Sequence, residues 1–500
     1  MSDSPHEPAS LWMQTAPPIA TDDELPPGSE VVVAGAGLTG VATALLLARR
    51  GMRVTVVEAR RVGAVTTGGT TGKLSLLQGS TLGAIRDQAG DRALRAYVEG
   101  GQVAQAWLVD EIGADPAIAQ QAPAGTYATT PEGDQAIARE REAMQVCGLQ
   151  TGDLPSDELP FPVTGGIAMP GQWQLHPMRV LHRLVERLRE RGGRVVEGCR
   201  VTGADVQEHT VRVQTARGDI ECAALVLATG TPILDRGLFF AKLVPSRAFV
   251  GAYACDPDQL PRGIHLSVDE QSRSLRTARA ADGETLLLAG SEGFTPGRPD
   301  STRAVLDGLD EWVARWFRGA RRVTWWAAQD YRSVNRLPFA GRLPRGGDRI
   351  YAATGYAKWG MTGSVAAAHA IAGEIAGETP EWAAELAQAR PVVTAGDSAV
   401  AANAAVAGEL AKGWAGAQIS RGSAEPAEGA GRVTADGLRP IAESTVDGVV
   451  CRVSAVCTHL GGIVQWNDAE RTWDCPLHGS RFDRRGRLLE GPAVRDLSRE

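Results

Sequence analysis

Two short motifs of Cys and His near the C-terminal end carry the most specific chemistry in this sequence. Cys457-x-His459 and Cys475-x-x-His478 are separated by fifteen residues, and each motif offers one thiolate and one imidazole. A [2Fe–2S] cluster can take two thiolates on one iron and two imidazoles on the other. Zinc accepts the same side chains, although zinc fingers usually place two Cys on one turn and two His on another. The four residues predict a metal centre and favour an iron–sulfur cluster over zinc.

The residues around these ligands resemble the two cluster loops of the Rieske fold. The matching segments read CTHLGG from Cys457 and CPLHGSRFD from Cys475. Respiratory members of that family have one more Cys in each loop, and the two pair as a disulfide; Gly462 and Leu477 stand at those places here. Ser480 stands where the family's serine donates a hydrogen bond to a cluster sulfur. The resemblance implies a [2Fe–2S] cluster without the disulfide, in the Rieske potential range of about −150 to +300 mV.

A dinucleotide-binding pattern begins near the other end of the chain. The sequence predicts a buried strand at Val31–Ala34, a glycine turn at residues 35–40, a helix at Val41–Arg50 and a second strand at Arg53–Val57, which ends at Glu58. The glycines of such a turn let a pyrophosphate approach the helix N-terminus, and the acid accepts hydrogen bonds from the ribose. An acid at this place favours FAD or NAD over NADP.

Later segments resemble the D-amino-acid oxidase and glycine oxidase superfamily of flavoproteins. Residues 66–79, TTGGTTGKLSLLQG, are similar to the segment that runs beside the flavin pyrophosphate. Residues 165–188 resemble the approach to a "P-x-x-L" helix, and residues 224–230 the strand that returns to the cofactor. Residues 331–341 resemble an "R-P-x-x-x-x-P-x-x-G" segment, although Ser333 replaces its first proline. The resemblance implies FAD.

The expected FAD contacts follow these segments, together with the GYAKWGMT turn, whose helix N-terminus would face the flavin ring and stabilise its anionic reduced form. The candidate cofactor-binding residues are Gly35, Gly37, Leu38, Thr39, Gly40, Glu58, Ala59, Arg60, Thr70, Thr71, Lys73, Val201, Ala228, Thr229, Gly230, Gly355, Lys358, Trp359, Gly360, Met361 and Thr362.

Three residues are candidates for catalysis: Tyr331, Arg332 and Lys358. Lys358 could place a charge at the flavin or meet a substrate carboxylate, and a solvated surface lysine is the alternative. Trp325, Trp326 and Tyr331 cluster directly before Arg332. They form either an aromatic wall around a small substrate or over the flavin edge, or part of the core.

Composition restricts the class of partner. The chain has 500 residues, a formal net charge of −7 and no basic stripe, so nucleic acid and anionic membranes are not expected partners. Apart from the cluster pair, the Cys residues have no framework spacing, which favours reduced thiols in the cytosol. The N-terminal stretch shows no secretion signal, and no apolar run is long enough for a membrane span. We expect a cytoplasmic protein.

The predicted fold is an α/β (α+β) Rossmann-like FAD-binding domain with an interleaved substrate-binding mixed sheet, followed by an all-β Rieske domain. The expected parts are an N-terminal arm at 1–28, a flavin domain at 29–390, a linker with a short helix at 391–430 and a Rieske domain at 431–500. Within the flavin domain, residues of about 29–85, 165–235 and 335–385 are expected to bind FAD. The ordered pair of domains resembles bacterial FAD-dependent oxidoreductases with a C-terminal Rieske domain.

The predicted function is a dehydrogenase that oxidises a small amine or amino acid at FAD and passes single electrons through the cluster to an outside protein or quinone. An electron-transfer reductase fed by NAD(P)H is one alternative, but no second strand–GxGxxG–helix unit is present. A Rieske oxygenase needs an iron held by two His and a carboxylate, and the six His outside the cluster motifs lack that spacing. A redox carrier or sensor without turnover is the third alternative.

Overall fold

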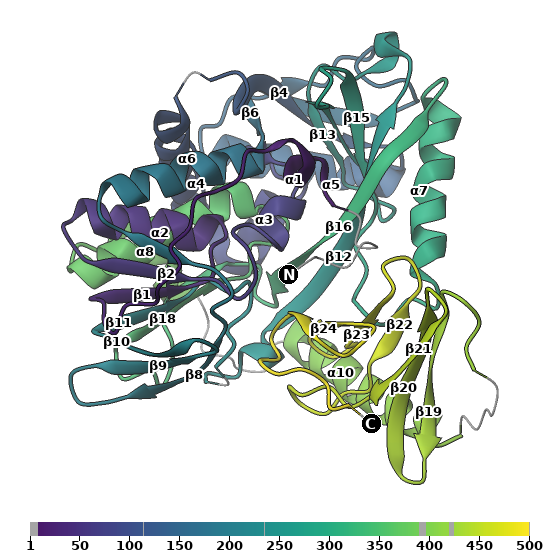
Figure 1. Cartoon of the computed structure of the whole chain (residues 1–500). Coiled ribbons are helices and arrows are strands. Elements are labelled where there is room, and N and C mark those ends of the chain that lie inside the picture. Colours follow the sequence, from purple (N-terminus) through teal and green to yellow (C-terminus); the bar gives the residue numbers. More distant parts are fainter. Residues whose placement is uncertain (1–8, 114, 235, 390–396, 420–424, 500) are drawn as a thin grey trace.

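The computed structural model describes residues 9–113, 115–234, 236–389, 397–419 and 425–499. Figure 1 shows a mostly parallel sheet with helices on one side, a large second sheet beside it, and a smaller β-rich body at the C-terminal end that rests against both. The chain visits the first two sheets alternately, so segments far apart in sequence meet between them.

The first sheet has the strand order β17-β18-β11-β1-β2-β7 and is built around the predicted dinucleotide unit. Every residue of its central strands is buried, as expected for parallel strands covered on both faces. Helices cover one face and a small antiparallel sheet, β10-β9-β8, covers the other. The bounds are β1 (Val31–Ala34), α2 (Leu38–Arg49), β2 (Val54–Val57), α6 (Pro177–Glu190), β7 (Arg194–Val196), β8 (Val201–Val206), β9 (Val211–Thr215), β10 (Gly218–Cys222), β11 (Ala224–Leu227), β17 (Phe339–Arg342), β18 (Ile350–Thr354) and α8 (Gly360–Ala376).

The second sheet is mixed and has the order β16-β12-β15-β14-β13-β4-β6-β3, with β5 paired to β6. Its two longest strands, β12 and β16, form an antiparallel ribbon that reaches from this sheet toward the C-terminal body (Figure 1). The bounds are α3 (Thr66–Gly69), β3 (Lys73–Leu74), α4 (Thr81–Ile112), β4 (Ala119–Ala128), α5 (Pro131–Val146), β5 (Gly152–Asp153), β6 (Gly165–Leu175), η1 (Phe239–Ala241), β12 (Leu243–Ala254), η2 (Pro257–Gln259), β13 (Ile264–Ser267), β14 (Ser274–Arg279), β15 (Thr285–Gly290), α7 (Thr302–Trp316), β16 (Arg321–Ser333) and α9 (Glu381–Ala389).

One region differs from its sequence prediction. The sequence of residues 84–148 predicts mainly helix, and α4 and α5 are helices, but Ala119–Ala128 between them is strand β4. This strand has few β-branched residues, and its pairing partners, β6 and β13, come from distant parts of the chain. Tertiary pairing therefore overrides a weak local preference.

The C-terminal body contains two small antiparallel sheets, β19-β20-β21 and β22-β23-β24-β25, around the buried rings of Trp473 and Phe482. The Asp447-Gly448 pair in the sequence predicts a hairpin between β20 and β21. The chain turns there, and both residues have left-handed φ angles (56° and 68°), as a type I′ turn requires. The bounds are α10 (Asp397–Ile419), β19 (Gly431–Asp436), β20 (Arg439–Val446), β21 (Val449–Ser454), β22 (Gln465–Asn467), β23 (Thr472–Asp474), β24 (Arg481–Asp483) and β25 (Leu488–Glu490).

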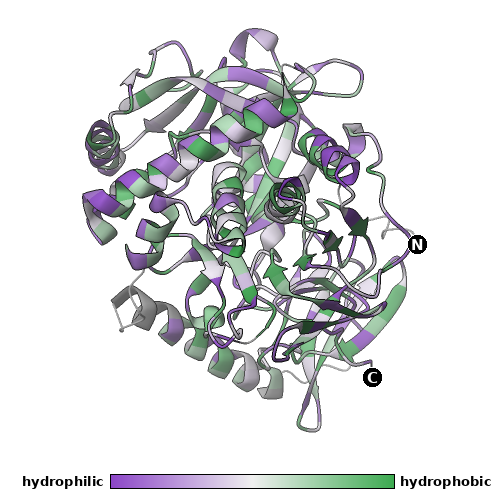
Figure 2. Ribbon diagram, turned by 90° about the vertical axis from the view of Figure 1, so that its left-hand side faces the viewer, coloured by the Kyte–Doolittle hydropathy of each residue, from purple (hydrophilic) through white to green (hydrophobic). Residues whose placement is uncertain are grey.

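Two peripheral helices attach to these units. In α10, Trp414 packs on the C-terminal core and its Nε1 donates to the Gly461 carbonyl at 3.1 Å; the side chain of Val400, expected on the same face, lies outside the described residues. Helix α1 (Leu11–Thr15) is docked through buried Leu11 and Trp12. Figure 2 shows hydrophobic residues concentrated on the interior elements. In the described ranges, no helix is long and apolar enough to cross a membrane.

Candidate functional site

The glycine turn after β1 brings the N-terminus of α2 against the strand β11. A Cβ on Gly35, whose φ is 107°, would lie 2.4 Å from the Ala228 carbonyl oxygen, and a Cβ on Gly40 would lie 1.9 Å from that of Gly35. Only glycine fits these positions without displacement of backbone. The first amide of the helix, that of Leu38, donates to Thr67 Oγ1 at 3.1 Å. The turn and helix thus present backbone N–H groups where a pyrophosphate could bind.

Glu58 is held rigidly at the end of β2. Its carboxylate accepts hydrogen bonds from the amides of Ala36 at 2.9 Å and Arg60 at 2.8 Å. Burial raises the pKa of Glu58, while these amides and the charge of Arg200 act in the opposite direction. Both oxygens therefore have fixed orientations at the cavity described next, as a ribose-binding carboxylate requires.

A cavity of about 280 Å³ runs from the glycine turn to the second sheet. Most of the predicted cofactor-binding residues line it, whereas Gly40, Gly355 and Thr362 lie behind its wall. The predicted residues that line it are Gly35, Gly37, Leu38, Thr39, Glu58, Ala59, Arg60, Thr70, Thr71, Lys73, Val201, Ala228, Thr229, Gly230, Lys358, Trp359, Gly360 and Met361. The fold thus gathers six separate segments of the chain around one elongated space.

Two lysines border the part of the cavity next to the second sheet, of which Lys73 is buried and Lys358 is exposed. Lys73 Nζ donates to the His265 carbonyl at 2.7 Å and to Ser274 Oγ. Burial, together with the charges of Arg276 and Lys358, lowers the pKa of Lys73 to about 7. Desolvation by the surrounding protein also lowers the pKa of Lys358, although the charge of Asp330 opposes this. This end of the cavity suits an anionic group.

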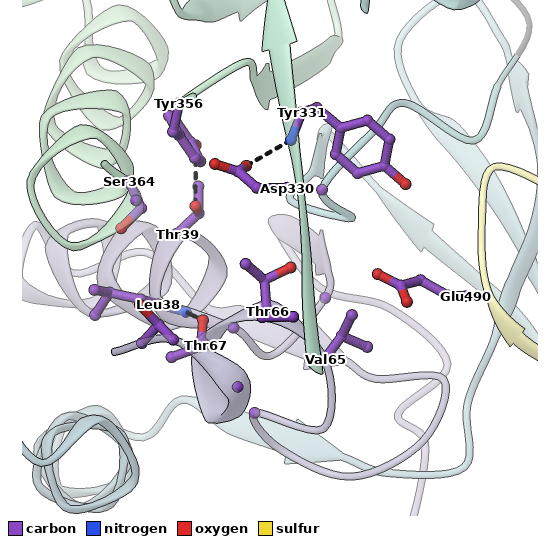
Figure 3. A pocket seen from close by; sticks show the side chains of 18 of the residues that line it. Leu38, Thr39, Val65, Thr66, Thr67, Asp330, Tyr331, Tyr356, Ser364 and Glu490 are labelled. Atoms are coloured by element: carbon purple, nitrogen blue, oxygen red, sulfur yellow. Dashed lines mark hydrogen bonds between the residues drawn. The ribbon is translucent and has the colours of Figure 1, made fainter. Parts of the chain in front are cut away.

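The loop that carries Lys358 is fixed by Asp330. Lys358 has a left-handed φ of 75°, and its backbone amide donates to the Asp330 carboxylate. The same carboxylate accepts from the Tyr331 amide at 2.7 Å, as Figure 3 shows. Asp330 is buried, which raises its pKa. It acts as a brace between strand β16 and the turn before α8.

The residues around Asp330 have different surroundings. Tyr331 lines the large cavity, whereas Arg332, the third catalytic candidate, does not. Trp326 is buried against Trp12, and Trp325 packs on Phe249. Neither tryptophan lines the cavity, so the prediction of an aromatic substrate wall is wrong for both and the core-packing interpretation holds.

The Cys and His motifs form two adjacent loops. In the first, the Cys457 amide donates to the Gly462 carbonyl at 2.8 Å; in the second, the Cys475 amide donates to the Ser480 carbonyl at 2.8 Å. A Cβ on Gly462 would lie 3.0 Å from Cys475 Sγ, so glycine allows the loops to approach closely. The His459 and His478 ring centroids are 5.1 Å apart. All four predicted ligands therefore converge.

The chemistry of this donor set fits an iron–sulfur cluster. A hydrogen bond from the Cys475 thiol lowers the pKa of Cys457, which shows how close the two sulfurs are. Nδ1 of His478 is buried and has no hydrogen-bond partner among the described residues, as expected for a ligand atom. Ser480 also contributes a hydrogen bond to Cys457. The thiolates and the imidazoles supply the two halves of a mixed-ligand [2Fe–2S] site.

The two histidines of this site face the part of the molecule that contains the large cavity and the first two sheets, which we call the flavin-type half (residues 29–390). The ring of Phe240 in η1 lies 5.6 Å from that of His478 and 6.4 Å from that of His459. Both histidines and Phe240 line a small second cavity, which Tyr331 also lines. Tyr331 therefore borders the large cavity on one side and the histidines on the other.

Buried charges hold the two halves together. Arg247 of β12 donates to Glu470 from Nε at 2.6 Å and approaches Glu490 at 3.4 Å. Arg481 pairs with the same two acids and with Asp474. Although burial opposes it, the charges of Arg247 and Arg481 lower the pKa of Glu470 to about 2. We refer to these five side chains as the interface ion cluster.

Several cavity residues escaped prediction from the sequence. Asp330 has no motif of its own, and its only signal was its position next to Tyr331; Tyr356 lies within the GYAKWGMT turn but was not among the candidates. Arg200 directly precedes the candidate Val201. The largest omission is the segment Leu489–Val494, of which all but Pro492 line the large cavity although they follow the second cluster motif. No local pattern links this segment to a cofactor.

Comparison with known proteins agrees with this geometry. The family described as "FAD dependent oxidoreductase" matches residues 30–374, and the "Rieske [2Fe-2S] domain" matches residues 433–499. The Rieske 2Fe-2S iron-sulfur protein YhfW of Bacillus subtilis (strain 168) is 32% identical over 478 residues, which cover 94% of this chain and 92% of that protein.

Solved structures show the same fold over the flavin-type half. L-amino acid deaminase from Proteus myxofaciens is similar with a TM-score of 0.58 at 18% identity, covering 74% of this chain and 94% of that chain. L-proline dehydrogenase from P. horikoshii is similar with a TM-score of 0.58 at 18% identity, covering 72% of this chain and 96% of that chain.

Proposed function

Because the chain belongs to the FAD-dependent oxidoreductase family and carries a Rieske [2Fe–2S] domain, we propose that it is a dehydrogenase for a small amine or amino-acid-like substrate. Its cofactors are FAD and the Rieske cluster. The electrons would leave one at a time through the cluster to an external protein or quinone. In this proposal residues 29–390 bind FAD and substrate, residues 391–430 connect the domains, and residues 431–500 hold the cluster.

The position of Tyr331 is the observation that carries this proposal. Its ring separates the cavity that suits FAD from the small cavity lined by His459 and His478. Its hydroxyl accepts from Gln329 Nε2 at 3.0 Å, and the same nitrogen donates to the Gly479 carbonyl in the second cluster loop at 2.8 Å. A two-electron cofactor and a one-electron centre are thus adjacent in one chain, which favours single-electron export over a plain oxidase.

The residues of the second sheet supply the argument for the substrate class. Lys73 and Lys358 favour a carboxylate at this end of the cavity, and Ser246, Ser272 and Ser291 line the cavity as small polar groups. Similar folds occur in proteins named for L-proline and L-amino acids, which combine a carboxylate with an amine. Bound FAD would accept a hydride from the carbon next to the nitrogen and release the electrons singly. The chain's own role is to orient the substrate and exclude water.

The test is anaerobic reduction of the purified holoprotein. Secondary amines and amino acids, and separately NADH, would be added while the flavin spectrum and the electron paramagnetic resonance (EPR) of the cluster are followed. We expect an amine or amino acid to bleach the flavin and then reduce the cluster. Rapid bleaching by NADH alone would instead identify a reductase, and reduction by dithionite alone would identify a carrier or sensor.

A pair of His variants tests the electron route. His478→Ala should abolish the cluster's EPR signal but leave FAD bound and reducible by substrate, so that electrons no longer reach a one-electron acceptor. His182→Ala is the matched control, because His182 lies on α6, is 3.4 Å from the side chain of Glu186 and lines neither cavity. Unchanged acceptor reduction in His478→Ala would contradict export through the cluster.

A further inference from the structure

We propose that the FAD site is shared between the two domains, with Leu489–Val494 of the Rieske domain forming part of its wall and the Glu490 carboxylate accepting a hydrogen bond from an FAD hydroxyl. FAD carries such hydroxyls on its ribose and on its ribityl chain, and the inference concerns this shared chemistry. It depends on FAD as the cofactor and not on the identity of the substrate.

The geometry of the cavity is the first support. Leu489, Glu490, Gly491, Ala493 and Val494 line the same cavity as the residues of the glycine turn and Glu58. In Figure 3 the Glu490 carboxylate points into this space from the Rieske side, across from Thr66 and Val65. A dinucleotide that fills the cavity would therefore contact both domains.

Two contacts fix this wall to the flavin domain. The guanidinium of Arg200, which itself lines the cavity, donates from Nη2 to the Leu488 carbonyl at 3.2 Å. The hydroxyl of Tyr331 donates to the Gly491 carbonyl at 3.3 Å. The segment therefore has a defined position beside the cavity.

Glu490 retains hydrogen-bonding capacity for a ligand. It is 8% exposed, and its distances to the two arginines are long, 3.4 Å to Arg247 and 3.5 Å to Arg481. By comparison, Glu470 receives a 2.6 Å hydrogen bond from Arg247. A carboxylate has about four acceptor positions. Glu490 can thus accept a hydroxyl donor. Burial raises the pKa of Glu490, and the charges of Arg247 and Arg481 act in the opposite direction.

The same segment touches the cluster site on its other side. The amide of Ala493 donates to Ser480 Oγ at 3.0 Å, and Pro492 lines the small cavity with both ligand histidines. A ligand that fixes Leu489–Val494 therefore also fixes a group beside the cluster. Because linkage is reciprocal, FAD binding and the environment of the cluster should influence each other.

Hydrogen–deuterium exchange on the full-length wild-type protein gives a test that needs no variant. FAD-free and FAD-loaded protein, both with the cluster intact, would be compared by mass spectrometry. We expect FAD to slow exchange in peptides that cover residues 488–495 as well as in the glycine turn, while peptides of β19–β21 stay unchanged. Equal exchange of residues 488–495 with and without FAD would overturn the shared site.

Two Glu→Gln variants, each of which replaces a carboxylate by a neutral amide, test the role of the Glu490 carboxylate. Glu490→Gln should weaken FAD binding to the FAD-free protein roughly tenfold or more, the loss expected for one hydrogen bond to a charged group. Glu443→Gln is the control, because Glu443 is an 8% exposed Rieske-domain acid that pairs with Arg432 and Arg452 but does not line the cavity. The Rieske EPR signal reports an intact domain in both. An unchanged Kd for FAD in Glu490→Gln, with that signal retained, refutes the role of the carboxylate.

Discussion

Replacement of Arg247 by Met should separate the contributions of the interface ion cluster from those of ordinary packing. Arg247 is 4% exposed, extends from β12 of the second sheet and pairs with Glu470 and Glu490 of the Rieske domain. Met retains much of the aliphatic length and removes only the charge and the donors. The change leaves two buried carboxylates that share a single remaining arginine, Arg481.

Two independent arguments give the magnitude. Removal of one partner from a buried ion pair costs about 3 to 5 kcal/mol. The second argument uses Glu470, whose pKa falls from the ordinary 4.5 to about 2. At 1.36 kcal/mol per pKa unit, this shift corresponds to about 3 kcal/mol of stability. Since Arg481 still pairs with Glu470, we expect the free energy of unfolding to fall by about 3 kcal/mol, the lower end of that range.

The pH dependence gives the same prediction a second readout. A carboxyl whose pKa is lower in the folded state stabilises the fold above its unfolded pKa, and this contribution disappears as the pH falls through the folded value. For Glu470 the contribution should be complete above about pH 4.5 and lost toward pH 2. Arg247→Met should weaken this acid dependence, because the charge that lowers the pKa is gone.

The assay is urea denaturation of the holoprotein from pH 3 to pH 7, with the Rieske signal and flavin absorbance as separate probes, since two domains with cofactors need not unfold in one step. The control is Arg212→Met, which removes an exposed ion pair with Asp219 and should cost less than about 1 kcal/mol. If Arg247→Met costs no more than Arg212→Met at pH 7, the ion cluster does not hold the domains together.

Three further predictions concern other contacts. Gly297 has a φ of 69°, and a Cβ there would lie 2.6 Å from the Asp474 carbonyl oxygen. Gly297→Ala should therefore lower the urea midpoint of the Rieske signal by the equivalent of about 1 kcal/mol or more. The control is Gly308→Ala on α7, where a Cβ would lie in open space, and it should be neutral or stabilising. Burial lowers the pKa of Lys73 to about 7, so the affinity for benzoate, measured by flavin difference spectra, should fall as the pH rises through that value. Lys73→Met should remove this pH dependence. The same pH dependence in the variant would exclude Lys73 as the group that binds the carboxylate. Gly462→Ala would place a Cβ 2.6 Å from Leu477 Cδ1 and 3.0 Å from Cys475 Sγ, so cluster content measured by iron analysis should fall while FAD content stays constant; full occupancy would show that the loops can separate.

Most residues of the site could be predicted from local sequence motifs. The glycine turn, Glu58 and the Cys and His motifs are each defined by close spacing along the chain, because one loop or one strand end must supply several contacts to the same group. The sequence also predicts a strand at Ile350–Thr354 and a helix at Arg303–Phe317. The structure has β18 at Ile350–Thr354 and α7 at Thr302–Trp316. These elements depend on local pattern and burial.

The parts that could not be predicted depend on contacts between distant segments. Strand β4 forms because β6 and β13 pair with it. Trp325 and Trp326 are adjacent in β16 and point to opposite faces, where they pack on Phe249 and Trp12 respectively. Glu490 reads in the sequence as one more charged residue of a small β domain. Its place beside a nucleotide cavity results from docking of that domain, which no local spacing encodes.

The distribution of the docking contacts argues for a cluster that stays in place during turnover. Two more contacts supplement the interface ion cluster. Thr302 Oγ1 donates to Asn467 Oδ1 at 2.7 Å, at the end of β22, and Arg298 Nε donates to the Pro476 carbonyl at 3.1 Å, in the second cluster loop. A shuttling domain would have to break these contacts together and would also open one wall of the FAD cavity. If Leu489–Val494 contacts FAD, bound FAD adds its own binding energy to docking, because a ligand stabilises the state that binds it. Electron exchange between the two cofactors then needs no domain movement, and only the step to the outside acceptor depends on diffusion.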